Sequence, residues 1–484
     1  MMFYYFSRQF SHIFLCLVAC LVLNACSSGS GDNDTNLRPD PVDSITLNRG
    51  DLAISVGWEY FGASGVAFVV SANPTTPVAS LTPVTVSLNG QTALITGLSE
   101  NTAYDISVQT RAKGLQSPPL TSRLTPTVID DAQYTALLVN NDPSLSGVFD
   151  PSFLRDSAGT IWMAYSGVDY YQMNGNLVQD VSTRVARSDD NGTTFTLVTT
   201  LGSPGSTTVT DTSMTLGCAN NQCTGRWVYE VPFLIDDVND PNSNQRFKIY
   251  AHKYFLMPGA SPATIYLLGA LVRWTAPTPD SLWSGEDVVF SWNLTPPELA
   301  GGINLNQSAT TLSNCLLFTE GTASVGMLMS QDSIDFVFSC PYPDAGASTI
   351  RQRIVQFRST DHGQSLTYIG EPLSADDAGQ SGAEYYSAPS LLPRVDSAPV
   401  LLVTPVVNGL YAGCEVFTYS DITNAAVFKS NGNPDPLLLI PQLASNFGGA
   451  CAWDRGMSGT GITLNSFDAL STPPFSIQSS HHPL

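Results

Sequence analysis

Apolar and polar residues alternate along most of this 484-residue chain, and helical periodicity is almost absent. The alternation recurs in segments such as 103–112 (AYDISVQTRA), 160–167 (TIWMAYSG) and 247–255 (FKIYAHKYF). A period of two is typical of strands that bury one face. A chain of this length also favours two or more folded units. The pattern predicts an all-β protein with a first unit over 41–127 and a longer one over 130–484.

A short repeat divides the longer region. It occurs as DPSFLRD (150–156), VPFLIDD (231–237) and APSLLPR (388–394). The prolines lie at 151, 232 and 389, so the steps are 232 − 151 = 81 and 389 − 232 = 157 residues. A copy without the proline is therefore expected near residue 310. A fifth start is expected at 449–456 (GACAWDRG).

Five units of about 60–80 residues, each made of short strands, account for the region. Such strands are expected to close into a ring, because an open sheet would leave unpaired edges. We predict a five-bladed β-propeller in which the strand 134–140 (YTALLVN) completes the last blade. Six shorter blades are the alternative.

Two twelve-residue segments of this region share one pattern, RSDDNGTTFTLV (187–198) and RSTDHGQSLTYI (358–369). Both resemble the Asp-box of sialidases and related propellers, S-x-D-x-G-x-[ST]-[WF]. In a tight hairpin, the carboxylate accepts hydrogen bonds from turn amides and the glycine takes a positive φ. We expect both segments to be scaffold turns without a catalytic role.

The first unit contains the segment 97–120 (GLSENTAYDISVQTRAKGLQSPPL), which resembles the fibronectin type III pattern. In that pattern Tyr104 is the corner tyrosine, and Ile106 and Val108 face inward. Trp58 lies where that family keeps a buried tryptophan. The resemblance implies a fibronectin type III-like sandwich over 41–127, and we expect it to act as a spacer.

The N-terminal residues form a targeting segment. Arg8 precedes an apolar run at 13–23 that is short for a membrane span and ends in LNAC, with Cys26 last. This resembles a bacterial lipoprotein signal, in which 1–25 is removed and the cysteine is lipidated. An ordinary signal peptide or a short membrane anchor is the alternative. Residues 26–40 are typical of a flexible tether. We expect a protein of the bacterial cell envelope, at the outer membrane, held there only by its lipid.

The cysteines outside the N-terminal segment and the net charge limit which metals and partners the chain is expected to bind. Six cysteines remain after those of the predicted signal and Cys26 are set aside, and an even number in an oxidising compartment predicts three disulfides. Five histidines are few for a zinc site. The expected pairs are Cys218–Cys223, Cys315–Cys340 and Cys414–Cys451. The balance of 20 basic to 41 acidic residues argues against nucleic acid. We expect no cofactor and no metal, and a carbohydrate or an extracellular protein as partner.

Acidic residues at the starts of the blades are the candidate catalytic groups, because the first strands of a propeller surround a common funnel. The segment 149–167 resembles the opening blade of five-bladed glycosidases related to arabinanases, xylosidases and fructosidases. The resemblance implies a catalytic role for Asp150, and YEVP (229–232) loosely resembles their EGP motif, which implies Glu230 as general acid. Asp454 or Glu384 is the candidate third carboxylate. Turn capping is the structural alternative for Asp150.

Glycoside cleavage needs one carboxyl group that protonates the leaving oxygen and another that acts as base or nucleophile. Further residues at the blade starts are candidates for binding substrate. They are Glu384, Tyr385, Tyr386, Trp453 and Arg455. The aromatic side chains could instead fill the spaces between blades, and both interpretations stay open.

Three functions follow as hypotheses. The first is a surface-anchored glycoside hydrolase-like propeller acting on a neutral glycan. The second is a non-catalytic propeller that binds glycan or protein for a surface complex, because the third blade offers no obvious Asp where the glycosidases have one. The third is a sialidase, for which Arg155, Arg246 and Arg455 would form the carboxylate-binding trio.

Overall fold

The fold is almost entirely β, as the alternation predicts. The computed structural model describes residues 38–50, 53–75, 84–99, 102–124, 126, 135–173, 176–202, 204–210, 218–257, 268–291, 303–304, 315, 319–325, 333–343, 350–392, 399–430, 432–440, 448–453, 462–468 and 471–480. Within these residues, α2 (Ala375–Gln380) is the one α-helix, and none is long and apolar enough to span a bilayer. Single 3-10 turns lie at Ala219–Asn221, Ser243–Gln245 and Ile422–Asn424. The predicted signal, 1–25, and Cys26 lie outside the described residues.

The first unit has two sheets that share one hydrophobic cluster. One sheet contains β1 (Ser44–Gly50), β2 (Ala53–Glu59), β5 (Thr92–Thr96) and β4 (Thr85–Asn89). The other contains β3 (Ala67–Pro74), β6 (Tyr104–Ala112), β7 (Leu115–Gln116) and β8 (Leu120–Leu124). Trp58, Leu98 and Tyr104 are buried in the cluster. The Tyr104 hydroxyl accepts a hydrogen bond from the Ser99 amide at 2.9 Å, which closes the corner before β6.

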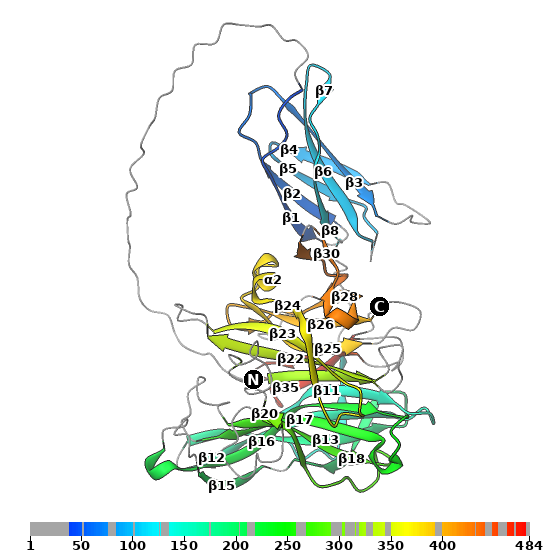
Figure 1. The fold of residues 1–484 in the computed structure, drawn as a ribbon, viewed down its shortest axis with the longest axis vertical. Helices are drawn as coiled ribbons and strands as arrows, with labels where there is room; N and C mark the ends of the chain where they lie inside the picture. Colours follow the sequence, from blue (N-terminus) through cyan, green and yellow to red (C-terminus); the bar gives the residue numbers. More distant parts are fainter. Residues whose placement is uncertain are drawn as a thin grey trace.

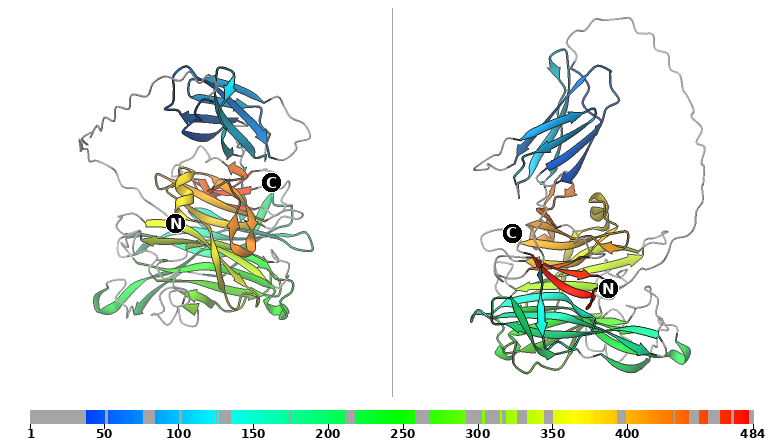
Figure 2. Two further views of the ribbon diagram at one scale, coloured as in Figure 1. Left: turned by 45° about the horizontal axis from the view of Figure 1, so that its top comes forward. Right: turned by 180° about the vertical axis from the view of Figure 1, so that it is seen from behind.

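The described strands of the longer unit form five blades, which we number 1 to 5 (Figures 1 and 2). Blades 1 and 5 are joined into one sheet by the pairing of Gly147 with Phe475. Blade 1 contains β11 (Gly147–Arg155), β12 (Ile161–Met173), β13 (Asn176–Ser188) and β14 (Thr194–Thr200), with β10 (Leu138–Asn140) parallel to β14. Blade 2 contains β16 (Gln222–Asp236), β17 (Phe247–Leu256), β18 (Gly269–Ala276) and β19 (Asp287–Ser291), with β15 (Gly205–Thr210) and β20 (Ile303–Asn304) at its edges. Blade 3 contains β21 (Thr319–Val325), β22 (Ile334–Pro343), β23 (Ile350–Ser359) and β24 (Thr367–Leu373).

Blades 4 and 5 complete the set. Blade 4 contains β25 (Tyr385–Leu392), β26 (Val400–Val407), β28 (Cys414–Asp421) and β29 (Ala426–Val427), joined by β27 (Leu410–Tyr411) and β32 (Leu438–Ile440). Blade 5 contains β33 (Gly448–Trp453), β34 (Ile462–Phe467) and β35 (Phe475–Ser480). A separate hairpin of β30 (Lys429–Ser430) and β31 (Asn433–Pro434) contacts β8 of the first unit (Figure 1).

The first strands of the five blades form a closed ring. The inner strands β11, β16, β21, β25 and β33 contact one another in this order, and β33 contacts β11 again. In the view from behind, the red strand of blade 5 lies between blade 1 and blade 4 (Figure 2). The longer unit is therefore a five-bladed propeller, and the six-bladed alternative is wrong.

The expected closing strand is present in its first half, whereas its second half, β10, pairs with β14 of blade 1. The fourth strand of blade 5 is β9 (Thr135–Ala136), which pairs antiparallel with β35 (Ala136 opposite Gln478). The Leu137 amide adds a bond to the Ile477 carbonyl at 2.9 Å. Residues from before blade 1 thus complete the last blade.

The proline repeat corresponds to a β-bulge in the inner strands. The register shifts at residues 150–151 of β11, 231–232 of β16, 388–389 of β25 and 450–451 of β33. The first residue of each bulge has a positive φ between 47° and 51°, namely Asp150, Val231, Ala388 and Ala450. In three of the four, proline follows, because the bulge needs no ladder donor there.

Blade 3 has the bulge without the proline. In β21 the register shifts between Thr319 and Gly321, so Glu320 has the position that Asp150 has in blade 1. The prediction of a copy near residue 310 is therefore wrong, because the first described strand of blade 3 begins at Thr319.

Side chains from the second strand of one blade bind the bulge of the next blade. In each blade, one residue of the second strand pairs with the inner-strand residue just before the bulge. We call these five residues the clasp residues. They are Ser166, His252, Ser339, Thr404 and Asn465. Three of them accept the amide of the next bulge, at 3.0 Å (Val231 to Ser166), 2.7 Å (Ala450 to Thr404) and 2.9 Å (Asp150 to Asn465). The blades are therefore joined by polar bonds as well as by apolar packing.

The two Asp-box-like segments are hairpin turns with one common set of bonds. In the first, the Ser188 hydroxyl donates to Asp190 Oδ1 at 2.7 Å and accepts from the Gly192 amide at 2.8 Å. The Asp190 carboxylate accepts from the amide (2.9 Å) and the hydroxyl (2.7 Å) of Thr194. The second turn repeats these contacts with Ser359, Asp361, Gly363 and Ser365.

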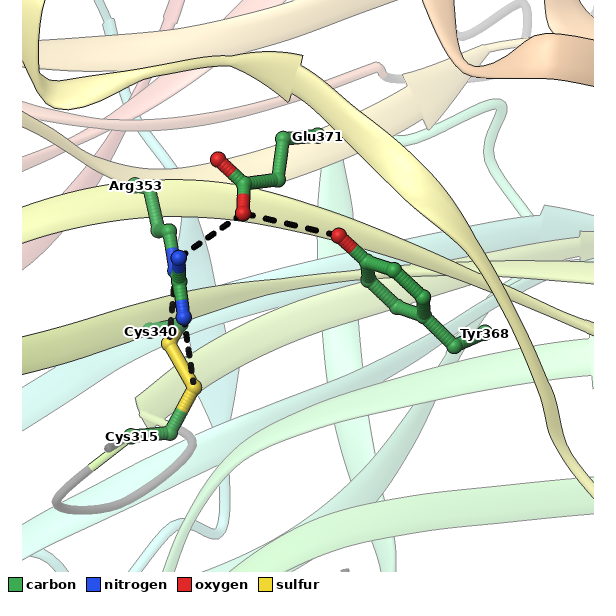
Figure 3. Close-up of a disulfide and its surroundings, with 5 residues drawn as sticks. All are labelled: Cys315, Cys340, Arg353, Tyr368 and Glu371. Carbon is green, nitrogen blue, oxygen red and sulfur yellow. Dashed lines mark hydrogen bonds and ion pairs between the residues drawn. A yellow bond between two sulfur atoms is a disulfide. The ribbon is translucent and has the colours of Figure 1, made fainter. Parts of the chain in front are cut away.

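The three expected disulfides are present. Cys218–Cys223 and Cys315–Cys340 have Cα atoms 5.4 Å apart, and Cys414–Cys451 has them 6.2 Å apart. The third joins β28 of blade 4 to β33 of blade 5. At the second, the Arg353 Nε donates to Cys340 Sγ at 3.4 Å while Nη1 binds Glu371 at 2.8 Å (Figure 3). The guanidinium thus ties the disulfide to β24.

We predict that Asp190→Asn lowers the melting temperature at pH 7 because its carboxylate accepts the bonds that close the turn. Hydrogen bonds from Thr194 hold the pKa of Asp190 at about 2, below its usual value. A depressed pKa stabilises the fold above the unfolded value of about 4 and loses this contribution as pH falls toward 2. The melting-temperature difference between wild type and variant should therefore shrink over this interval.

Asp189→Asn is the matched control for that experiment. Asp189 is the preceding residue, 62% exposed, and pairs only with Arg187 among the described residues. Exposed pairs of this kind contribute little. A loss in Asp190→Asn that is equal at pH 2.5 and pH 7, or no larger than that of the control, would contradict the role of the turn.

Candidate active site

Asp150 lies at the bulge of β11, where the left-handed backbone turns it out of the ladder. Aspartate tolerates a positive φ better than most residues. Its Oδ1 accepts a bond from Asn465 Nδ2 at 2.8 Å, and its own amide donates to Asn465 Oδ1 at 2.9 Å. Its Oδ2 accepts a bond from the Ser166 hydroxyl at 3.1 Å. Both carboxylate oxygens are thus oriented by neighbouring strands, one of them in blade 5.

Glu230 lies directly before the bulge of β16 and is 4% exposed. Its Oε2 accepts a hydrogen bond from the Tyr254 hydroxyl at 3.0 Å. Tyr254 is on the adjacent strand β17 and is itself buried. The carboxyl group is therefore buried, and a phenol is one of its partners.

His252 lies opposite Glu230 in the β16–β17 pair, at the clasp position of blade 2. Its ring packs against Tyr254 with centroids 4.9 Å apart. Burial lowers the pKa of His252 to about 3, because the charged ring would lose its hydration. The imidazole is therefore neutral at physiological pH and adds no positive charge beside Glu230.

Ser166 connects the two acidic residues. Its hydroxyl donates to Asp150 and accepts the amide of Val231, the residue after Glu230. Asp150 and Glu230 therefore lie on adjacent inner strands at the same level of the ring. The structure brings together these two candidates and adds Ser166, Tyr254 and Asn465, which the sequence did not single out as site residues.

The other candidates are placed differently. Tyr386 is 1% exposed, and its hydroxyl donates to Glu415 at 2.8 Å, so the packing interpretation holds for it. Glu384 is exposed and accepts the Gly409 amide at 3.2 Å. Tyr385 is half-buried at the start of β25. Trp453 ends β33 opposite Ile462. Asp454 and Arg455 lie outside the described residues.

Glu320 is an acidic residue that sequence reasoning missed. Its backbone lies at the bulge of β21, in register with Asp150. The segment TEGTASV (319–325) has neither the proline of the other copies nor the 81-residue spacing, which explains the omission. The sequence signal that could have indicated Glu320 is an acidic residue directly before a glycine near the start of a blade.

One cluster at the opposite end of the inner strands has ligand-type groups. Asp237, Asp240 and His362 bring potential ligand atoms within 4.8 Å of one another. The Lys248 ammonium, fully buried, lies 2.9 Å from Asp237 Oδ2 and 2.7 Å from Asp240 Oδ2. It already supplies the positive charge that a cation would bring. We interpret the cluster as structural: it joins the β16–β17 turn to the second Asp-box-like turn through the contact of His362 with Asp237 at 3.0 Å.

Comparison with solved structures finds distant similarity to glycoside hydrolases and sialidases. A family 117 glycoside hydrolase, Zg3597 of the marine bacterium Zobellia galactanivorans, is 10% identical over 73% of this chain and 91% of its own, with a TM-score of 0.39. The α-L-arabinofuranosidase Arb93A of Fusarium graminearum is 11% identical over 92% and 95%, with a TM-score of 0.35. The intramolecular trans-sialidase of Ruminococcus gnavus is 11% identical over 72% and 97%, with a TM-score of 0.36.

No family model matches the chain, and neither does any curated protein. The propeller architecture therefore stands on the strand pairing and the closed ring of inner strands.

We predict that His252 stays neutral down to about pH 4. A folded pKa below the unfolded value of about 6.5 means that the unfolded chain binds the extra proton, so stability falls as pH drops from 6.5 toward 3. Two-dimensional NMR of ring nitrogens should show a neutral imidazole at pH 5, and His252→Gln should flatten the decline of the melting temperature. A ring that titrates near pH 6.5 would contradict this account.

Proposed function

We propose that the propeller is a glycoside hydrolase that acts on a neutral glycan, with Asp150 and Glu230 as its leading carboxylates. The observation that supports it is their place at one level of adjacent inner strands, joined through Ser166. Cleavage of a glycosidic bond requires two such carboxyl groups with different roles.

The bonds around each carboxyl group suggest its role. Both oxygens of Asp150 accept hydrogen bonds from neutral donors, an arrangement suited to an ionised base or nucleophile. Glu230, buried beside Tyr254, is then the proposed general acid, which protonates the leaving oxygen. Glu320, at the equivalent bulge position in the inner strand of blade 3, is a further carboxylate to test.

The charge around the pair favours a neutral substrate. Asn465, Ser166 and Tyr254 are neutral donors that bind the two carboxylates, and His252 opposite Glu230 is uncharged. An anionic sugar would need cationic groups there. Arg155 binds the Gly159 carbonyl and Arg246 binds Asp236, both at the far end of the inner strands. A sialidase is therefore the less favoured candidate.

A second candidate is a non-catalytic propeller that binds a glycan or an extracellular protein. The burial of Glu230, with 4% of its surface exposed, favours it, because a proton donor must reach the substrate. A wild-type protein that hydrolyses no glycan but binds one would identify this function.

We propose, from the N-terminal segment, that Cys26 anchors the protein by lipid to the bacterial outer membrane and that 41–127 acts as a fibronectin type III-like spacer. Its two sheets and the Tyr104–Ser99 bond support the second part. The proposed contact with the membrane is through the lipid alone.

The proposal predicts hydrolysis by the full chain on a panel of neutral chromogenic glycosides and polysaccharides. Asp150→Asn and Glu230→Gln should each lower kcat by about 100-fold or more, because each removes a group that moves a proton or carries charge. Glu320→Gln tests the additional carboxylate in the same assay. Asp189→Asn, at the far end of blade 1, is the control.

Folding of each variant is checked by its melting temperature. Equal activity of wild type, Asp150→Asn and Glu230→Gln would rule out the proposed pair. No hydrolysis of any substrate by the wild type, with binding to one of the polysaccharides, would favour the binding propeller.

A further inference from the structure

Asp150 and Glu230 belong to different blades, so their relative position depends on how the blades seat against each other. The described strand pairs join β11 to β12 and to β35, and β16 to β15 and β17, but do not join β11 to β16. A backbone ladder therefore does not hold the two strands in register, and side chains must do so.

Ser166 is the clasp residue of blade 1, and its two bonds reach both of the inner strands that carry the acidic pair. Asn465 also donates to the Asp150 carboxylate, at 2.8 Å, but both of its bonds go to Asp150. Thr404 accepts the amide of Ala450, and Asn465 that of Asp150. Ser166 accepts the Val231 amide at 3.0 Å and also donates its proton to Asp150 Oδ2 at 3.1 Å. A hydroxyl has one donor and two acceptor sites, so it can make both bonds at once.

We propose that Ser166 is a positioning residue, which sets the orientation of Asp150 relative to Glu230. The inference rests on the proposed function in that it names the residue on which the geometry of the acidic pair depends. Ser166 is 1% exposed, so water does not readily replace its hydroxyl once it is removed. Without it, one oxygen of Asp150 loses its described donor, and the Val231 amide loses its acceptor.

The same interface offers a matched control. The Ser152 hydroxyl accepts the amide of Leu234 at 3.0 Å, so it is also a bond from blade 1 to β16. Ser152 lies just after the bulge of β11, and its hydroxyl bonds to the Leu234 amide and, among the described residues, to neither carboxylate. Ser152→Ala and Ser166→Ala each remove one hydroxyl-to-amide bond between the same two blades, but only the second touches Asp150.

The experiment compares Ser166→Ala, Ser166→Thr and Ser152→Ala with wild type in the full chain. Both alanine variants should lower the melting temperature by similar amounts. Ser166→Ala should lower kcat by about 10- to 100-fold with KM within about threefold, because a small misplacement of a reacting group affects the transition state most. The acidic limb of its pH–rate profile should move to higher pH, because the Asp150 carboxylate loses a donor.

Ser152→Ala should keep kcat within about twofold, and Ser166→Thr, which retains the hydroxyl, should recover most of the activity. Equal kcat losses in the two alanine variants would overturn the proposal and leave Ser166 a stability residue.

Crystal structures of the two alanine variants decide the matter independently of activity. We expect the Asp150 carboxylate to move by about 1 Å in Ser166→Ala and to stay in place in Ser152→Ala. An unmoved carboxylate in Ser166→Ala overturns the proposal. If the wild type hydrolyses nothing, the proposed function fails, while a displaced Asp150 would still support the positioning role.

Discussion

The backbone amides at the five bulges are the constraint on which the rest of the propeller depends. A bulge takes a residue out of the ladder, and a buried amide without an acceptor is costly. At three of the bulges the neighbouring blade supplies that acceptor through a polar side chain on its second strand, namely Ser166, Thr404 and Asn465. The blades are thereby joined in one register. Apolar packing holds them together, but it is non-directional, whereas a bond to one specified amide fixes the level at which adjacent strands meet.

The same feature concentrates backbone strain where the acidic residues gather. Val231 has φ 51°, which is a genuine outlier for a β-branched residue, and it follows Glu230 directly. Such conformations cost on the order of 1–3 kcal/mol and persist when the surroundings determine them. Here the Ser166 hydroxyl, the proline that follows and the buried strands of blade 2 provide those surroundings. The backbone strain at Val231 and the position of the acidic residues therefore both follow from the bulge.

Strand alternation and the proline repeat were enough to predict the architecture, the closing strand and the disulfide pairs, because these depend on local patterning and on an even set of cysteines. The repeat was visible because proline tolerates the missing ladder bond. Blade 3 lacks that proline, so its start was misplaced and Glu320 was missed. The clasp residues were invisible because serine, histidine, threonine and asparagine fill one structural position. Their partners also lie 46 to 315 residues away. Tyr386 was ambiguous because an aromatic residue before a bulge suits either a binding surface or the core, and its bond to Glu415 places it in the core.

The strand β9 has a mechanical consequence. It closes the ring, yet it also follows the first unit along the chain, so tension applied to the residues before Thr135 reaches the ring first at β9. Its pairing with β35 covers two residue pairs, supplemented by the Leu137–Ile477 bond. The Cys414–Cys451 crosslink and the clasp of Thr404 hold blade 5 to blade 4 from the other side. A sustained pull would therefore peel β9 from blade 5 before it separated that blade from its neighbour.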